Sequence, residues 1–236
     1  MSTVLLVRHG LTTMTGPVLA GHTPGVVLDD RGVGQAAALA TRLAALPLDA
    51  VVTSPLERCQ QTATAILSAQ RAAGREPQWS VDERIVEVRY GDWTGRPIKE
   101  LAKDPLWKVV QAQPSAVTFP SGERMADMQA RGVAAVREWN ARLGEDAVWV
   151  ACTHGDVIKA ILADAHGMHL DMFQRIVADP CSVSAVRYTD SRPFVLRTND
   201  TGGDLAVLAP PAKPRRRRRP AAPDATLGGG AGGGAV

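Results

Sequence analysis

The chain has 236 residues, 45% of them hydrophobic and 22% charged, and this composition fits one globular domain of ordinary size. The formal net charge of +3 is concentrated at one end: from Ala209 onward six basic residues and one acidic residue give +5, which leaves −2 for the rest of the chain. No run approaches the roughly 18 consecutive apolar residues that span a bilayer, and the first residues lack the pattern of a secretory signal, so we expect a cytoplasmic protein rather than a membrane or secreted one.

The first predicted element is a buried strand that ends in Arg8, His9 and Gly10. The run Val4–Val7 has four consecutive apolar residues, two of them β-branched, which is typical of a strand covered on both faces. In open α/β sheets, ligands bind outside the carboxyl ends of the strands, so Arg8 and His9 are expected to reach a site there. The triplet alone is a weak signal, because a lone histidine is more often structural than catalytic.

An irregular connection, a helix, a second strand and a second helix follow. The connection, Leu11–Asp30, has no periodicity and is expected to lie over the strand ends. The apolar face of the first helix is predicted to contain Val33, Ala36, Ala40, Leu43 and Leu46. Asp49–Thr53 is a short buried strand, and Ser54–Glu57 after it has the pattern of a helix start with Ser54 as the N-cap. Arg58 therefore falls in the first turn of a helix at a strand's carboxyl end.

The middle of the chain is predicted to hold a loop and two helices. The loop, Glu87–Gly95, has two glycines. A short helix is expected over Lys99–Gln111, interrupted at Pro105, and a longer one over Glu123–Leu143. The inward positions of the longer helix are predicted to be Met125, Met128, Val133, Val136 and Leu143.

A third buried strand, Asp146–Cys152, repeats the geometry of the first. It ends in Thr153–Asp156 and is followed by a helical stretch. A further helix around Leu170–Val177 precedes two β-rich runs, Ser182–Tyr188 and Pro193–Thr198, which are predicted to form a hairpin. This alternation of strands and helices predicts an α/β fold.

The last part of the chain is rich in Pro, Arg, Ala and Gly and cannot bury a core. We therefore predict a folded domain over residues 1–208 and a disordered basic tail over residues 209–236. The five arginines Arg215–Arg219 are interpreted as a solvated run, and deletion of the tail is expected to leave fold and activity intact.

Three strands thus end in groups that carry chemistry: Arg8 and His9, then Arg58, then His154. Two guanidinium groups suit phosphate oxygens, and two imidazoles supply a candidate nucleophile and a further donor. Such a pocket predicts attack on phosphorus by a neutral imidazole, with a carboxylic acid that protonates the departing alkoxide.

Neither a metal nor a cofactor is expected. The histidines lie far apart without carboxylates at ligand spacing, and no glycine-rich nucleotide loop is present. The three cysteines, Cys59, Cys152 and Cys181, are odd in number and none belongs to a closely spaced pair, so neither a disulfide framework nor a thiolate zinc site is expected.

The sequence resembles a known family, the histidine phosphatases, also called the phosphoglycerate mutase-like superfamily. The matching motifs occur in the family's order over nearly all of residues 1–200 and are Arg8-His9-Gly10 with Thr12, Ser54–Arg58 with Gln61–Ala63, Glu87, Gly91–Gly95, Ser121–Glu123 and Thr153–Gly155. The resemblance implies a three-layer α/β/α fold with a mainly parallel central sheet. It also implies a phosphatase that hydrolyses small phosphomonoesters through a phosphohistidine intermediate.

The resemblance assigns roles to individual residues. It implies that His9 is the phosphorylated nucleophile, that Glu87 is the proton donor, and that the phosphate pocket is formed by Arg8, Arg58 and His154. Further candidates for substrate binding are Thr15, Gly21 and Gly155. The chain departs from the family at Thr15, where members commonly carry an asparagine that touches the phosphate, and Glu83 is the alternative proton donor.

Two other functions stay open at this point. One is a cofactor-dependent phosphoglycerate mutase, although the segment between Gly95 and Ser121 is short, at about 25 residues, whereas mutases that resemble the glycolytic enzyme usually carry a longer insertion there. The other is a non-catalytic protein that binds a phospholigand, or a nucleic acid through the arginine-rich tail. The expected partner is a small phosphorylated metabolite and not a membrane; the substrate itself stays open, as does assembly into a homodimer or higher homo-oligomer.

Overall fold

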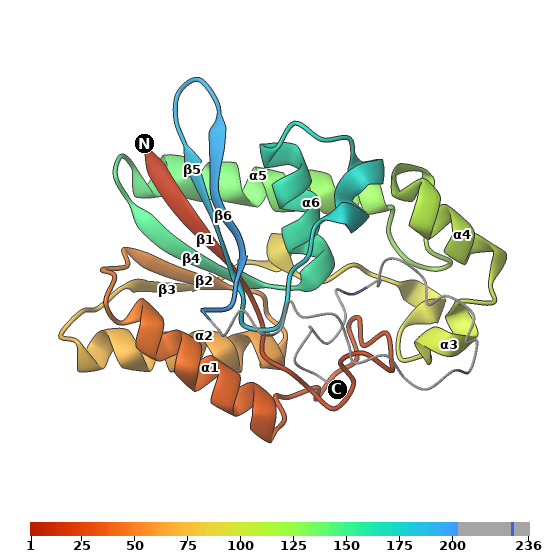
Figure 1. Cartoon of the computed structure of the whole chain (residues 1–236), viewed down its shortest axis with the longest axis horizontal. Helices are drawn as coiled ribbons and strands as arrows, with labels where there is room; N and C mark the ends of the chain where they lie inside the picture. The colour runs from red at the N-terminus through yellow and green to blue at the C-terminus, as the bar shows by residue number, and fades with distance from the viewer. Residues whose placement is uncertain (203–227, 229–236) are drawn as a thin grey trace, which may run out of the picture.

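A six-stranded sheet lies between two layers of helices (Figure 1). The computed structural model describes residues 1–202 and Gly228. The strands are β1 (Ser2–Arg8), β2 (Ala50–Thr53), β3 (Gln78–Val81), β4 (Val148–Thr153), β5 (Val183–Tyr188) and β6 (Pro193–Asp200). Their order in the sheet is β3-β2-β4-β1-β5-β6, with the first four parallel and the β5–β6 hairpin antiparallel. The predicted three-layer α/β/α fold with a mainly parallel sheet is thus confirmed.

Helices cover both faces of this sheet. The α-helices in the described residues are α1 (Asp30–Leu43), α2 (Glu57–Ala72), α3 (Ile98–Leu101), α4 (Pro105–Ala112), α5 (Met125–Leu143) and α6 (Gly155–Ala165), of which α3 and α4 lie to one side of the sheet. In Figure 1, α1 and α2 lie on one face of the sheet, and α5 and α6 lie on the other. The central strand β1 alternates between the two layers: Val4 and Leu6 pack into the core under α5 and α6, whereas Leu5 and Val7 pack into the core under α1 and α2. Burial on both sides explains why this strand is an uninterrupted apolar run.

The predicted apolar face of α1 is partly wrong. Val33 is 55% exposed, and Leu46 lies beyond the end of the helix. The buried face is instead centred on Leu39 and includes Gly32. The cause is a close backbone approach, because a Cβ atom on Gly32 would clash with the carbonyl oxygen of Leu11. Helix α1 therefore turns Gly32 toward the segment after β1, and Val33 faces outward.

Two further predictions change in detail. Pro105 does not interrupt a helix but begins α4, where the Asp104 carboxylate accepts a hydrogen bond from the Leu106 backbone at 2.9 Å and acts as the N-cap. The stretch around residues 170–177 forms a 3₁₀-helix, Leu170–Arg175, rather than an α-helix. The hairpin predicted near the end of the domain is present as β5 and β6.

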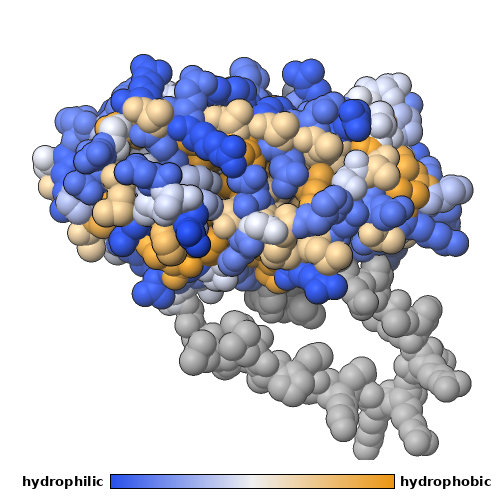
Figure 2. Space-filling model, turned by 90° about the horizontal axis from the view of Figure 1, so that it is seen from above, coloured by the Kyte–Doolittle hydropathy of each residue, from blue (hydrophilic) through white to orange (hydrophobic). Residues whose placement is uncertain are grey.

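The surface is mixed in character. The face in Figure 2 carries hydrophobic residues in several separate patches among hydrophilic ones. In residues 1–202 and at Gly228, no helix is both long enough and apolar enough to cross a bilayer. Among the same residues the three cysteines are buried and free. The predicted tail, residues 209–236, lies outside the described residues except at Gly228, and so does the predicted domain boundary at residue 208.

Candidate active site

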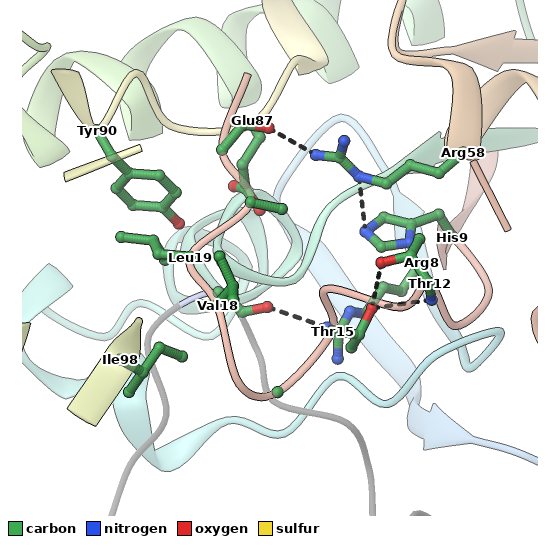
Figure 3. Close-up of a pocket in the computed structure, with 14 residues that line it drawn as sticks. Arg8, His9, Thr12, Thr15, Val18, Leu19, Arg58, Glu87, Tyr90 and Ile98 are labelled. Carbon is green, nitrogen blue, oxygen red and sulfur yellow. Dashed lines mark hydrogen bonds between the residues drawn. The ribbon is translucent and has the colours of Figure 1, made fainter. Parts of the chain in front are cut away.

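The carboxyl ends of the central strands open into a pocket (Figure 3). Six of the candidate residues from the sequence line it, namely Arg8, His9, Thr15, Gly21, Arg58 and Glu87. The other two, His154 and Gly155, are buried beside it and do not line it. The lining also includes Tyr90 and Gly228, which the sequence did not single out. The topology therefore brings together residues that are up to 220 positions apart in the chain.

His9 follows β1, and its backbone is held by two neighbouring elements. Its N–H donates to the carbonyl of Thr153 at the end of β4, at 3.1 Å. The next N–H, that of Gly10, donates to the hydroxyl of Thr62 in α2, also at 3.1 Å. These two hydrogen bonds fix the backbone that carries the imidazole at the place where β1, β4 and α2 meet.

The hydrogen bonds of the His9 ring assign its proton. Nδ1 lies 2.7 Å from the Gly10 carbonyl, which can only accept, so the proton is on Nδ1. Nε2 therefore keeps its lone pair, and it accepts a hydrogen bond from Nε of Arg58 at 3.3 Å. Burial lowers the pKa of His9 well below its ordinary value, and the charges of Arg58 and Arg8 lower the pKa further. A neutral imidazole whose Nε2 carries no proton is a competent nucleophile.

Two buried guanidinium groups flank this ring. Arg8 and Arg58 are each only 1% exposed. Arg8 donates from Nη1 to the Ala178 carbonyl at 2.8 Å and from Nη2 to the Gly228 carbonyl at 3.0 Å. Arg58 donates from Nη2 to the Gly21 carbonyl at 2.8 Å, whereas its Nη1 has no hydrogen-bond partner among the residues that the structure describes. Buried guanidinium donors beside an imidazole suit the oxygens of a phosphoryl group.

The environment of His154 corrects one prediction. Ser54 is not the N-cap of α2, which begins at Glu57 after the extended residue Leu56 and has no side-chain cap. The buried Ser54 hydroxyl lies 2.8 Å from Nε2 of His154, and this hydrogen bond satisfies both groups. On the other side of the ring, Nδ1 of His154 lies 3.3 Å from Nη2 of Arg58. Burial is the main cause that lowers the pKa of His154 well below its ordinary value, so the ring is neutral and orients Arg58.

Glu87 brings a carboxyl group into the same pocket. Its side chain is almost wholly buried, and one oxygen accepts a hydrogen bond from the Val88 backbone at 3.0 Å. Burial raises the pKa of Glu87 to about 7, and the negative charge of Asp156 contributes to the increase. Glu83, the alternative donor, is exposed and does not line the pocket. Near neutral pH, Glu87 can therefore hold a proton that an exposed carboxylate would have lost.

The irregular segment after β1 covers the strand ends, as predicted. Its Gly21 carbonyl holds Arg58, and its His22 ring lies 2.7 Å from the Glu87 carbonyl. Thr15 turns back within the segment: its hydroxyl accepts from the Thr12 backbone at 3.0 Å and lies 2.9 Å from the Thr12 hydroxyl. The segment thus contacts the side chain of Arg58 on one side of the pocket and the backbone of Glu87 on the other.

Arg131 in α5 holds the loop that carries Glu87, and the sequence did not reveal it. It donates to the carbonyls of Arg84 and Val86, each at 2.7 Å, and to that of Glu87 at 3.0 Å. It also forms a two-point ion pair with Glu123, at 2.6 and 3.1 Å. Glu123 belongs to a motif found in the sequence, but its partner lies eight positions away, and no local pattern marks it.

We expect Arg131→Ala to destabilise the protein because it removes a hydrogen-bond donor from three backbone carbonyls and the ion-pair partner of the Glu123 carboxylate. The free energy of unfolding should fall by about 2–4 kcal/mol, and turnover should fall with it as the Glu87 loop loosens. Urea unfolding measures the first effect. Arg124→Ala is the matched control, because the Arg124 side chain is exposed and its ion pair with Asp127 is long, at 4.0 Å. The effect of this change should stay within about 0.5 kcal/mol. Equal effects of the two changes would contradict the role given to Arg131.

Among residues 1–202 and Gly228, no group of three or more His, Cys, Asp or Glu side chains is arranged to hold a metal ion. The polar side chains that line the pocket are instead two guanidinium groups, one imidazole, one carboxyl group and the hydroxyl groups of Thr12, Thr15 and Tyr90. This set favours binding of an anion together with proton transfer.

Comparison with known proteins agrees with this geometry. Residues 4–201 match the profile of the histidine phosphatase superfamily, branch 1. Phosphoserine phosphatase 1 of Hydrogenobacter thermophilus is 28% identical over 207 residues, which cover 85% of this chain and 93% of that protein. The probable phosphoglycerate mutase GpmB of Yersinia pestis is 27% identical over 216 residues, which cover 90% of this chain and 97% of that protein. The solved structure of Bacillus stearothermophilus YhfR superimposes with a TM-score of 0.75 at 28% identity, over 85% of this chain and 98% of that one.

Proposed function

The chain belongs to the histidine phosphatase superfamily and is a phosphoric monoester hydrolase, and on that premise we propose that its reaction runs through a phosphohistidine on His9 with Glu87 as the proton donor. The observation that carries this proposal is the state of His9: a neutral ring, with Nδ1 fixed on a carbonyl and Nε2 directed toward a guanidinium group. Few structural roles require an imidazole to be held in this state between two buried arginines.

In the first step, the Nε2 lone pair of His9 attacks the phosphorus atom, and the bond from phosphorus to the ester oxygen breaks. Arg8 and Arg58 hold the non-bridging oxygens and offset their charge as the phosphoryl group transfers. The leaving oxygen takes the proton of Glu87 and departs as an alcohol. The step leaves phosphorylated His9 and a Glu87 carboxylate.

In the second step, water replaces the alcohol. The Glu87 carboxylate accepts a proton from the water molecule, whose oxygen attacks phosphorus and breaks the bond to His9. Inorganic phosphate leaves, and both residues return to their starting states. One carboxyl group thus serves as acid and then as base, which suits a pKa of about 7.

We propose a small phosphorylated metabolite as the substrate, turned over in the cytoplasm. The pocket wall opposite His9 is formed by Val18, Leu19, Tyr90 and Ile98 (Figure 3). The pocket has a volume of about 410 Å³, which suits a small substrate. Three buried free thiols fit a reducing compartment. The likeness to a probable phosphoglycerate mutase supports a second candidate function. Formation of 2-phosphoglycerate from 3-phosphoglycerate faster than release of free phosphate would identify a mutase.

The pH dependence of turnover tests this proposal. Glu87 must be protonated when an alkyl phosphate binds, so with a pKa of about 7 the rate should be highest below pH 7 and fall up to tenfold for each unit above it. His9 has a lowered pKa and stays neutral on the acidic side, so it does not limit the rate there. Phosphate release from propyl phosphate in the presence of EDTA gives the profile. With p-nitrophenyl phosphate, whose leaving group needs no proton, the alkaline fall should be much smaller, and identical profiles for the two substrates would contradict the proposal.

A further inference from the structure

Asp156 is a buried carboxylate whose charge contributes to the raised pKa of Glu87, but which takes no part of its own in the proposed steps of the reaction. It is the second residue of α6 and is fully buried. One of its oxygens, Oδ2, accepts a hydrogen bond from the Tyr90 hydroxyl at 2.8 Å. The other, Oδ1, lies 3.4 Å from Nζ of Lys159, one turn further along the helix. A charged side chain is rarely kept in such a position without a specific use.

The ammonium group on the far side of Asp156 is also held in place. Lys159 is 3% exposed, donates to the Gln174 side chain at 2.5 Å and lies over the ring of Phe173 at 4.6 Å from its centre. Lys159 therefore holds the Oδ1 atom of Asp156 through an ion pair within α6. Oδ2 points the opposite way, toward Tyr90, which lines the pocket.

Gly228 shows what Oδ2 of Asp156 can bind. The N–H of Gly228 donates to this oxygen at 3.0 Å, while the carbonyl of the same residue accepts from Nη2 of Arg8 at 3.0 Å. Gly228 itself lines the pocket, whereas Asp156 is fully buried beside it and does not line the pocket. Gly228 thus bridges the two side chains: its carbonyl accepts from Arg8, and its N–H donates to Asp156. A phosphomonoester could make the same two contacts if a phosphate oxygen accepted from Arg8 and a donor on the leaving group bonded to Asp156.

We propose that Asp156 is a specificity-determining residue, whose Oδ2 atom accepts a hydrogen bond from a hydroxyl or amine of the substrate's leaving group when the substrate takes the place of the Gly228 peptide group. The inference rests on the proposed phosphatase function and deepens it. A carboxylate cannot donate, and it repels another carboxylate, so the site selects against leaving groups that present an acid at this position. The substrate class is therefore the phosphate esters of polyols and amino alcohols.

Three short phosphate esters test the proposal as competitive inhibitors of p-nitrophenyl phosphate turnover. Phosphoethanolamine presents an ammonium donor, propyl phosphate has a methyl group in the same place, and phosphoglycolate presents a carboxylate. The inhibition constant should be lowest for phosphoethanolamine, about tenfold higher for propyl phosphate because a hydrogen bond to a charged group is lost, and highest for phosphoglycolate. Any other order in the wild-type protein overturns the proposal.

Asp156→Asn should remove this order. Lys159 requires an oxygen, so the amide places its oxygen toward Lys159 and its NH₂ group toward Tyr90 and the pocket, where a donor now stands in place of an acceptor. The ratio of the inhibition constants of propyl phosphate and phosphoethanolamine should fall below about twofold. Tyr90→Phe is the control: it removes the other hydrogen bond to Oδ2 but keeps the carboxylate, so the order should persist.

The outcomes separate this proposal from the function on which it rests. An equal rise of all three inhibition constants in Asp156→Asn would make Asp156 a structural residue and overturn the proposal. Failure of the phosphatase function appears elsewhere, as absence of p-nitrophenyl phosphate turnover in the wild-type protein.

Discussion

Replacement of His9 by alanine is expected to abolish both the covalent intermediate and turnover, with a fall in kcat of about 10⁴-fold or more. The side chain lies at the meeting point of β1, β4 and α2, with its Nε2 lone pair beside Arg58. No other imidazole lines the pocket in the described part of the chain. Mixing the wild-type protein with substrate and quenching without acid should trap a phosphoryl group that is labile to acid, and peptide mass spectrometry should locate it on His9.

His154 provides the control. Its ring is neutral and buried, its centre lies 5.2 Å from that of His9, and both of its nitrogens face side chains of the protein. His154→Asn should slow turnover by loosening Arg58, yet the adduct should still form on His9. An adduct on His154, or one that survives in His9→Ala, would reverse the assignment of the nucleophile.

Replacement of Glu87 by glutamine should separate substrates by the quality of their leaving groups. An alkoxide cannot depart without a proton, so hydrolysis of propyl phosphate should fall by about 10²–10⁴-fold. The p-nitrophenolate ion departs without help, so the fall in the first-turnover rate with p-nitrophenyl phosphate should stay below about tenfold. Rapid-quench measurement of alcohol release in the first turnover isolates this step from the later hydrolysis of the phosphohistidine, which the two substrates share. Glutamine keeps the size of the side chain and the hydrogen bond from Val88.

Glu83→Gln is the matched control for this experiment. The two carboxylates are four positions apart, but Glu83 is exposed and outside the pocket. Its replacement should change neither rate by more than about twofold. Equal losses on the two substrates in Glu87→Gln, or a larger loss in Glu83→Gln, would transfer the role of proton donor to another group.

Much of this site was predictable from the sequence because its main residues directly follow buried strands. Apolar runs ending in Arg8-His9 and Thr153-His154 indicate both the strands and the edge of the sheet at which they end. Parallel pairing of β1 with β4 then brings the two ends together. Glu87 follows no strand directly, and its assignment relied on the spacing of a motif.

The contacts that the sequence did not predict depend on packing between distant elements. Ser54 has the residue type of an N-cap, but its hydroxyl bonds a histidine 100 positions away. Arg131 holds carbonyls of a loop more than 40 positions earlier. Val33 fits the period of an apolar face, but the close approach of Gly32 to the backbone of Leu11 turns it outward. In each case the partner is set by the three-dimensional arrangement, and no local pattern marks it.

The place of β1 in the sheet has a consequence for the time course of synthesis. The strand is made first, yet it lies between β4 and β5, and Thr3 pairs with Val148. At about 5–20 residues per second, a ribosome that has synthesised β1 takes roughly 7–30 s more to reach β4, the partner of β1. During this interval the backbone of Val4–Val7 has neither neighbour, and such apolar runs are prone to pair with other chains. Since the backbone of His9 is hydrogen-bonded to β4, the nascent chain acquires the proposed catalytic centre only after this late and long-range pairing.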